Sequence, residues 1–173
     1  MQATHTSRRI LLPVRQWFIL FSLAFALLLN MIPLGRFPGM PDWVALVLTF
    51  WCIHQPLKVG MGSAFVLGIL MDVADGSVMG QHAFAYVLLA FAAAGLSRRI
   101  LWFPLTYQAI HVVPMLLGVQ VLMTVVRMMA GGAFPGILWF VSSFTSGLIW
   151  YPLTFLLLLP QYRPVERDEN RPI

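Results

Sequence analysis

The chain has 173 residues, of which 60% are hydrophobic and 10% are charged, and its mean hydropathy is +0.83. This composition excludes an ordinary soluble domain and predicts an integral membrane protein. The net charge of +5 does not indicate nucleic-acid binding, because the basic residues form no continuous face beside exposed polar sequence. Cys52 is the single cysteine, so the chain can form neither an internal disulfide nor a thiolate metal cluster.

The first two apolar stretches, 16–35 and 43–57, are predicted to be membrane helices. Arginines before the first stretch resemble the start of a signal peptide. No small-x-small cleavage site follows, so we interpret it as an uncleaved first membrane helix. The segment between the two helices is rich in proline and is expected to be a loop, in which Asp42 caps the second helix.

The third and fourth predicted helices, 59–75 and 77–97, follow with little polar sequence between them. The third helix is short and begins with a glycine-rich half, so it either crosses a locally thin bilayer or is shielded by its neighbours. The fourth helix is followed by the pair Arg98 and Arg99. Paired arginines at the end of an apolar helix indicate the cytoplasmic side of a membrane.

The fifth and sixth predicted helices, 101–129 and 134–159, complete the apolar part of the chain. Pro114 lies inside the fifth helix, where we expect a kink. The sixth helix contains a patch of small and hydroxylated residues, SSFTSG, at 142–147. The remaining tail, 161–173, is polar and is expected to be disordered.

Six helices would place both chain ends on one side of the membrane, and the basic residues test this count. Nine lysines and arginines then fall on the side of the termini and two fall on the other. This excess predicts that both termini are cytoplasmic. An arrangement with five spans, in which 59–97 forms one re-entrant unit, stays open. We predict one helical membrane domain, 16–160, between an N-terminal segment, 1–15, and the tail, 161–173.

The stretch 58–82 is the polar centre of this domain, because Asp72 and Asp75 lie between otherwise uncharged apolar runs. An ionised group at membrane depth costs about 2.5 to 3.5 kcal/mol, so Asp72 needs a partner, a wet cavity or an interfacial position. Small residues and Asp72 recur every four positions, which predicts a ridge where a second helix approaches closely. The ridge consists of Ala64, Gly68, Asp72, Gly76 and Gly80. Gly76 also predicts the end of the third helix.

Two interpretations of the acids remain open. Asp72, Asp75 and His82 can together bind a cation or relay protons. Alternatively, Asp72 accepts hydrogen bonds from backbone groups near the turn and Asp75 lies at the outer interface. We favour the second interpretation, because two carboxylates and one histidine without further oxygen ligands make a weak metal site.

Two other polar features also have structural and functional interpretations. His111 either bonds a carbonyl freed by Pro114 or faces a cavity, and we favour the structural role. The patch at 142–147 either packs against another helix or lines a substrate pathway, and we favour packing. The sequence contains no phosphate-binding loop, zinc motif or catalytic triad, so we expect no enzymatic activity, metal or cofactor.

Residues 40–91 resemble the rod shape-determining protein MreD family. The resemblance lies in the runs MPDWVALVLTFW and HQPLKVGMGSAFVLGILMDVADGSVMGQHAFAYVLLAF. The residues that match are Pro41, Asp42, Trp43, Trp51, Pro56, Gly60, Phe65, Gly68, Asp72, Gly76, Gly80, His82, Ala83 and Tyr86. From the fifth helix onward only the hydropathy is similar. The resemblance implies six membrane helices in a fold similar to the substrate-binding membrane subunits of vitamin (energy-coupling factor) transporters.

The resemblance also implies a function in the elongation of the lateral wall of rod-shaped bacteria. The expected protein is a non-enzymatic scaffold or regulator in the inner membrane that contacts MreC and, through MreC, the actin-like MreB and the wall polymerase and transpeptidase. The candidate partner-binding or structural residues are Gly60, Ala64, Gly68, Asp72, Gly76, Gly80, His82 and Tyr86. The alternative is a solute-binding membrane subunit of a vitamin or metal transporter. Such subunits commonly carry an alanine-x-x-x-alanine ridge on the first helix, where this chain has only Ala24 and Ala26.

Overall fold

The structure is a computed structural model that describes residues 14–32 and 39–161, and within these ranges every regular element is a helix. The helices are α1 (Gln16–Met31), α2 (Trp43–His54), α3 (Met61–Asp75), α4 (Gln81–Leu101), α5 (Leu105–Met129) and α6 (Val141–Leu158), with short 3₁₀ helices η1 (Ile137–Phe140) and η2 (Leu159–Gln161) flanking α6. The predicted all-helical class is therefore confirmed. Predictions for residues 1–13, 33–38 and 162–173 lie outside the described residues.

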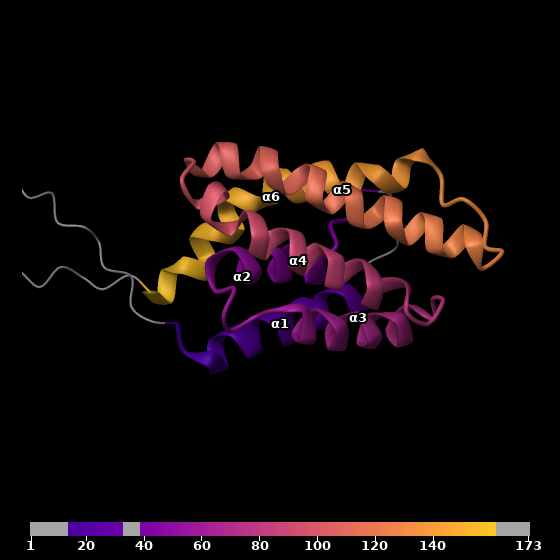
Figure 1. The fold of residues 1–173 in the computed structure, drawn as a ribbon, viewed down its shortest axis with the longest axis horizontal. Helices are drawn as coiled ribbons and strands as arrows, with labels where there is room; N and C mark the ends of the chain where they lie inside the picture. Colours follow the sequence, from indigo (N-terminus) through magenta and orange to yellow (C-terminus); the bar gives the residue numbers. More distant parts are fainter. Residues whose placement is uncertain (1–13, 33–38, 162–173) are drawn as a thin grey trace, which may run out of the picture.

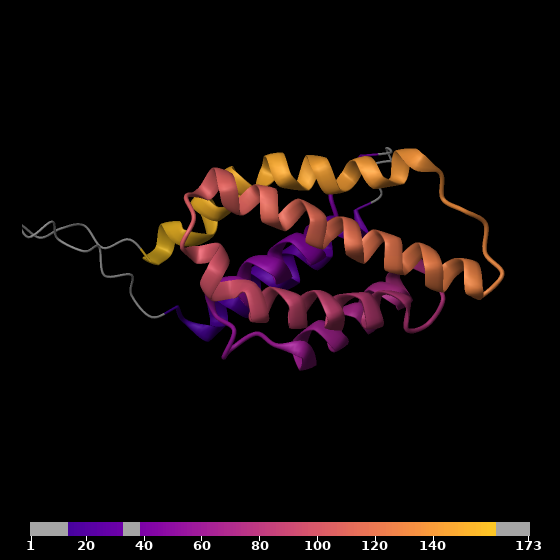
Figure 2. The same cartoon turned by 45° about the horizontal axis from the view of Figure 1, so that its top comes forward.

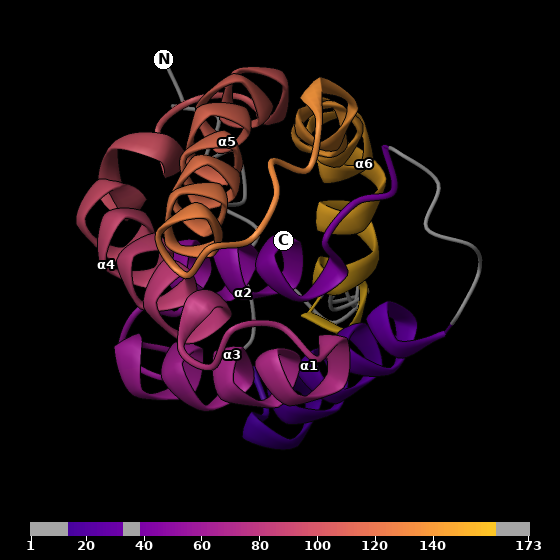
Figure 3. The ribbon, with the colours of Figure 1, turned by 90° about the vertical axis from the view of Figure 1, so that its right-hand side faces the viewer.

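The six α-helices form an elongated bundle around α2 (Figure 1). Viewed along its long axis, α2 occupies the middle and the other helices surround it (Figure 3). Every residue from Val44 to Ile53 is buried, as expected for a helix that is apolar on all sides. The helices α5 and α6 lie side by side along one flank (Figure 2).

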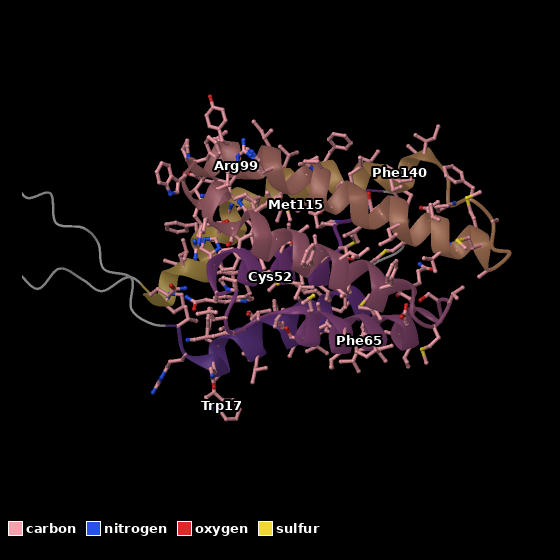
Figure 4. The ribbon with its side chains drawn as sticks, in the orientation of Figure 1. Trp17, Cys52, Phe65, Arg99, Met115 and Phe140 are labelled. Carbon is pink, nitrogen blue, oxygen red and sulfur yellow. The ribbon has the colours of Figure 1, made fainter. Side chains whose placement is uncertain are left out.

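The bundle has two ends, which we name by what lies there. At the terminal end α1 begins and α6 finishes, and at the opposite turn end lie the α3–α4 turn and the α5–α6 loop (Figure 1). Figure 4 shows the Arg99 side chain near the terminal end and Phe140 towards the turn end. An even number of helices thus brings the two ends of the described chain together, as the sequence predicts.

Several helix ends differ from the predicted boundaries for identifiable reasons. The helix α4 begins at Gln81, four residues later than predicted, because Gly80 has a φ of +94°, which a right-handed helix does not allow. It continues through the arginine pair to Leu101, since positive charge is favourable in the last turn of a helix. The helix α5 begins at Leu105 instead of 101, because Pro104 has an extended backbone.

The helix α2 also ends earlier than predicted, at His54. Gln55 has a φ of −138° outside the helical region, as expected for the residue before Pro56. The α-helical part of α6 begins only at Val141, after the η1 turn. The predicted cap is confirmed, because Asp42 Oδ1 accepts a hydrogen bond from the Ala45 backbone N–H at 3.0 Å.

Helix lengths bear on the membrane assignment. Three helical stretches among the described residues are long and apolar enough to cross a membrane: Gln81–Leu101, Leu105–Met129 and Ile137–Gln161. The apolar helices Gln16–Met31 and Trp43–His54 are shorter. Large apolar side chains such as Trp17 and Phe65 point outward, whereas Cys52 lies inside the bundle (Figure 4). These features agree with a membrane protein, while six full spans remain a prediction.

Candidate functional site

Asp72 is buried at the end of α3, where it fastens the α3–α4 turn through several hydrogen bonds. Its Oδ1 atom accepts hydrogen bonds from the His82 backbone N–H at 2.8 Å and from the Ser77 hydroxyl at 2.9 Å. Its Oδ2 atom accepts a hydrogen bond from the Gly80 backbone N–H at 2.8 Å. The carboxylate therefore replaces the water that these groups would otherwise bind. The interpretation of Asp72 as an acceptor for backbone groups near the turn is confirmed.

The imidazole of His82 lies between the two acids of the turn. Its Nδ1 atom is 2.8 Å from Asp72 Oδ1, so we assign the proton to Nδ1, since an ionised carboxylate can only accept. Its Nε2 atom is 3.6 Å from Asp75 Oδ2, and the Asp75 side chain is 39% exposed. The structure thus brings together the three residues that the sequence singled out. No group of three or more metal-ligating side chains suited to an ion occurs in the ranges that the structure describes.

Gly68 marks the closest approach between α3 and α4. A Cβ atom built on Gly68 would lie 2.3 Å from the Cα atom of Ala83, and no real Cβ tolerates such a distance to backbone. One turn earlier, Ala64 is fully buried. The predicted ridge of small residues is therefore confirmed at Gly68, where it packs against α4 of the same chain. Its last two members, Gly76 and Gly80, lie in the turn after α3 and do not form a helix-packing surface.

Two further glycines of the ridge shape the turn itself. Gly76 has a φ of +59° and caps α3, and Gly80 has a φ of +94° immediately before α4. Side chains other than glycine rarely adopt these angles. Gly60 is not part of this turn, because it precedes the other end of α3. There its backbone N–H donates to the Ser63 hydroxyl at 3.1 Å.

Tyr86 connects α4 to the start of α2 and, indirectly, to α1. Its hydroxyl donates to Asp42 Oδ2 at 2.7 Å. Asp42 Oδ1 accepts a hydrogen bond from the Asn30 side-chain amide at 2.9 Å, and Asn30 Oδ1 accepts one from the Trp43 backbone N–H at 3.0 Å. Asn30 is not among the residues predicted from the sequence, although a lone amide near the end of an apolar helix is the signal that could have identified it.

The hydroxylated patch at 142–147 contacts α5. Ser143 donates to the Gln120 side-chain oxygen at 2.5 Å, and the Gln120 amide donates to Ser142. A Cβ atom at Gly147 would lie 2.3 Å from a methyl carbon of Val113, so the two helices are tightly packed there. This arrangement supports the packing interpretation of the patch.

The detailed expectation for His111 is wrong. Its Nδ1 atom lies 2.8 Å from the Tyr107 carbonyl oxygen. The carbonyl that Pro114 frees is four residues before it, at Ile110, because proline lacks the N–H that would donate there. His111 therefore bonds one turn back on its own helix, as polar side chains in apolar helices commonly do.

Two small cavities lie between the described helices. One of about 10 Å³ lies between α2, α5 and α6 and is lined by Asp42, Gln120 and three serines of the patch, among others. Its size suits a single water molecule. The other, of about 200 Å³, lies between the beginnings of α1 and α3. Both are below the roughly 300 to 1,000 Å³ that is usual for small-molecule sites.

Comparison with known proteins gives two matches. The family described as rod shape-determining protein MreD matches residues 8–159. The rod shape-determining protein MreD of Haemophilus influenzae is 32% identical over 160 residues, which cover 88% of this chain and 96% of that protein. No solved structure matches the chain.

Proposed function

Since the chain belongs to the MreD family of rod shape-determining proteins, we propose that it is a non-enzymatic scaffold or regulator of lateral wall growth that binds MreC. Membership of the family assigns the chain a role in determining cell shape. The contact with MreC is the finer part of the proposal. Through MreC the protein acts together with MreB and with the wall polymerase and transpeptidase.

The observation that carries this proposal is a rigid turn with an apolar tip. Asp72 and the contact at Gly68 hold α3 and α4 together from the inside. On the outside of the same turn, the side chains of Val73, Val78 and Met79 are exposed. Exposed apolar side chains on a rigid support are typical of a protein contact, since little conformational entropy is lost when the partner binds.

The candidate residues then divide into two roles. Ala64, Gly68 and Asp72 are buried and act indirectly, because they hold the turn in shape. The apolar tip makes the contact with the membrane segment or the periplasmic base of MreC. Changes at buried positions therefore weaken binding by distorting the turn, and changes at the tip weaken it directly.

The test is co-purification of MreC with variants that place a charge on exposed positions. Met79→Glu alters the tip, where the side chain is 69% exposed. The matched control is Met129→Glu, at the last residue of α5 at the same end of the bundle, where the side chain is 84% exposed. We expect Met79→Glu to reduce recovered MreC about fivefold or more, as for an interface residue worth at least 1 kcal/mol. Cells that depend on this variant should become round.

The control variant, Met129→Glu, should recover MreC normally and keep cells rod-shaped. Both variants should accumulate in membranes to the same level, because neither position is buried. Normal MreC recovery with Met79→Glu and also with Val78→Glu would contradict the proposed contact and leave only the family's general role in cell shape.

The proposed location is the inner membrane, with both termini in the cytoplasm. The basic residues at the terminal end support it, since positive charge is retained on the cytoplasmic side. A reporter protein that fluoresces only in the cytoplasm tests this location when it is fused after residue 173. Loss of fluorescence in a stable fusion would show that residue 173 lies outside the cytoplasm. Either the orientation would then be opposite to the proposed one, or the chain would cross the membrane five times.

The likeness to vitamin-transporter subunits, and with it the alternative of solute binding, stays a prediction. A thermal-shift screen of the purified protein against vitamins and metal ions tests it. Stabilisation that saturates at micromolar ligand would favour the transporter alternative. We expect no stabilisation by vitamins, because neither cavity described above is large enough to enclose one, and none by metal ions, because the described residues hold no group of three or more metal-ligating side chains.

A further inference from the structure

A cavity of about 200 Å³ lies at the terminal end, where the beginning of α1 meets the beginning of α3. Its walls are mostly apolar and come from two helices and the segment before α3. The apolar lining residues are Ile19, Leu20, Leu23 and Val59. Leu20 is 60% exposed, so the cavity continues into the outer surface of α1. In a membrane protein this surface faces lipid tails.

The lining of the cavity includes one positively charged side chain. This side chain is Lys58, and its Nζ atom donates a hydrogen bond to the Val14 carbonyl oxygen at 2.7 Å. This bond holds the ammonium group beside the start of α1 and uses one of its three donors. Arg15, the residue after Val14 in the sequence, is exposed and is not one of the lining residues. No acid is among the residues that line this cavity.

We propose that this cavity holds part of one anionic phospholipid, with the headgroup phosphate at Lys58, one acyl chain along the apolar walls and the rest of the molecule in the bilayer, since about 200 Å³ is too small to enclose a whole lipid. The combination of a mostly apolar lining and one cation matches the two parts of such a lipid. Basic pockets between membrane helices bind acidic lipid headgroups for this reason. The outward-pointing Trp17 beside the groove is typical of the membrane interface (Figure 4).

The occupant is a lipid and not free phosphate, because most of the lining is apolar and inorganic phosphate would leave it unfilled. A bound lipid would bridge α1 and α3 where the side chains leave space between them. The inference does not depend on the contact with MreC, which lies at the opposite end of the bundle.

Native mass spectrometry of the full chain, released from detergent with added lipid, tests the proposal. Phosphatidylglycerol and phosphatidylcholine with identical acyl chains are titrated separately. We expect tighter binding of phosphatidylglycerol. Lys58→Gln should weaken it about fivefold, the value for one cation near an acidic lipid surface, and Lys58→Arg should preserve it. Phosphatidylcholine binding should not change in either variant.

Two further variants separate the groove from general charge effects. Leu20→Trp fills the groove and should weaken binding of both lipids. Arg127→Gln removes an exposed cation at the turn end and should leave both affinities unchanged. Circular dichroism confirms that each variant is folded.

Three results would each overturn the proposal. One is equal binding of the two lipids by the wild-type protein, and another is unchanged phosphatidylglycerol binding in both Lys58→Gln and Leu20→Trp. The third is displacement of phosphatidylglycerol by an equal concentration of inorganic phosphate, which would show that the apolar groove contributes nothing.

Discussion

Asp72 shows how one acid in an apolar chain can have a structural role. It is 2% exposed, and its carboxylate accepts hydrogen bonds from three backbone N–H groups, a hydroxyl and an imidazole. These bonds offset the desolvation of the carboxylate, which would otherwise be costly inside a membrane. The backbone bonds were predictable from the sequence because the acid precedes a glycine turn. The sequence also grouped His82 with the two acids, but as part of a cation site or proton relay and not as a donor to Asp72.

Replacing Asp72 with alanine should destabilise the protein strongly. The change leaves the backbone N–H groups of Gly80 and His82 buried without an acceptor, at about 1 to 3 kcal/mol for each. We expect Asp72→Asn to cost less, because one oxygen remains to accept. Thermal unfolding in detergent measures both variants.

The Asp72→Asn variant also tests whether the acid takes part in a proton-coupled cycle with His82. If the role of Asp72 is structural, the defect in growth and cell shape should be of the same size at every external pH. A defect that changed strongly with pH would instead favour the proton-relay interpretation and would contradict the structural role.

Gly68 provides a second prediction at the residue scale, with a control on the same helix. Gly68→Ala should destabilise the protein by about 1 to 3 kcal/mol or more, because its Cβ would overlap the Ala83 backbone and force α3 and α4 apart. A Cβ at Gly62 meets nothing within 4 Å, so Gly62→Ala should be neutral or slightly stabilising. Equal stability of the two variants would contradict the close approach.

At the scale of elements, the α3–α4 hairpin is the part that the sequence predicted best. The four-residue spacing of small residues and the turn glycines are local signals. The first corresponds to the close contact at Gly68, and the second to the positive φ angles of Gly76 and Gly80. The start of α4 was misplaced because Gly80 could equally have been part of a helix or a turn. Only its backbone angle in the folded chain distinguishes the two.

The connection from α4 to α2 and α1 is a long-range feature that local patterns do not contain. Tyr86 is 44 residues from Asp42, and Asn30 is 12 residues from it. Residues so far apart in the sequence meet only once the bundle has formed. A match to the family pattern at Asp42 and Tyr86 indicated that both matter but not that they bond to each other.

Removal of the Tyr86 hydroxyl tests this connection. Tyr86→Phe keeps the buried ring and leaves Asp42 with one fewer donor, which should cost about 1 to 3 kcal/mol. The control is Tyr151→Phe, at a position that is 61% exposed on α6, where we expect no measurable change. If the two variants unfold at the same temperature, the hydrogen bond to Asp42 contributes nothing to stability.

At the scale of the whole molecule, hydropathy predicted the number of helices but not their places in the bundle. The helix α2 has a composition similar to α1, yet its residues 44–53 are all buried while much of α1 is exposed. Apolar composition does not distinguish a side chain that faces protein from one that faces lipid, since both surroundings are apolar. The central position of α2 therefore could not be derived from the sequence.

The buried position of the single cysteine permits a direct test of how the bundle crosses the membrane. Cys52 is fully buried within α2, so a membrane-impermeant maleimide should not label the wild-type protein until it is unfolded in detergent. Leu57→Cys and Met79→Cys then add reactive thiols at two exposed positions, one between α2 and α3 and one in the α3–α4 turn. No other cysteine has to be removed.

With six spans and cytoplasmic termini, Met79→Cys should be labelled in intact spheroplasts and Leu57→Cys only after the membrane is opened. In that arrangement the two positions would lie on opposite sides because α3 would cross between them, although with 15 residues it is shorter than a usual span. If both thiols were labelled only after opening, α3 and α4 would form a re-entrant unit. The α3–α4 turn would then be unable to meet a periplasmic part of MreC, and the proposed contact would have to lie within the membrane.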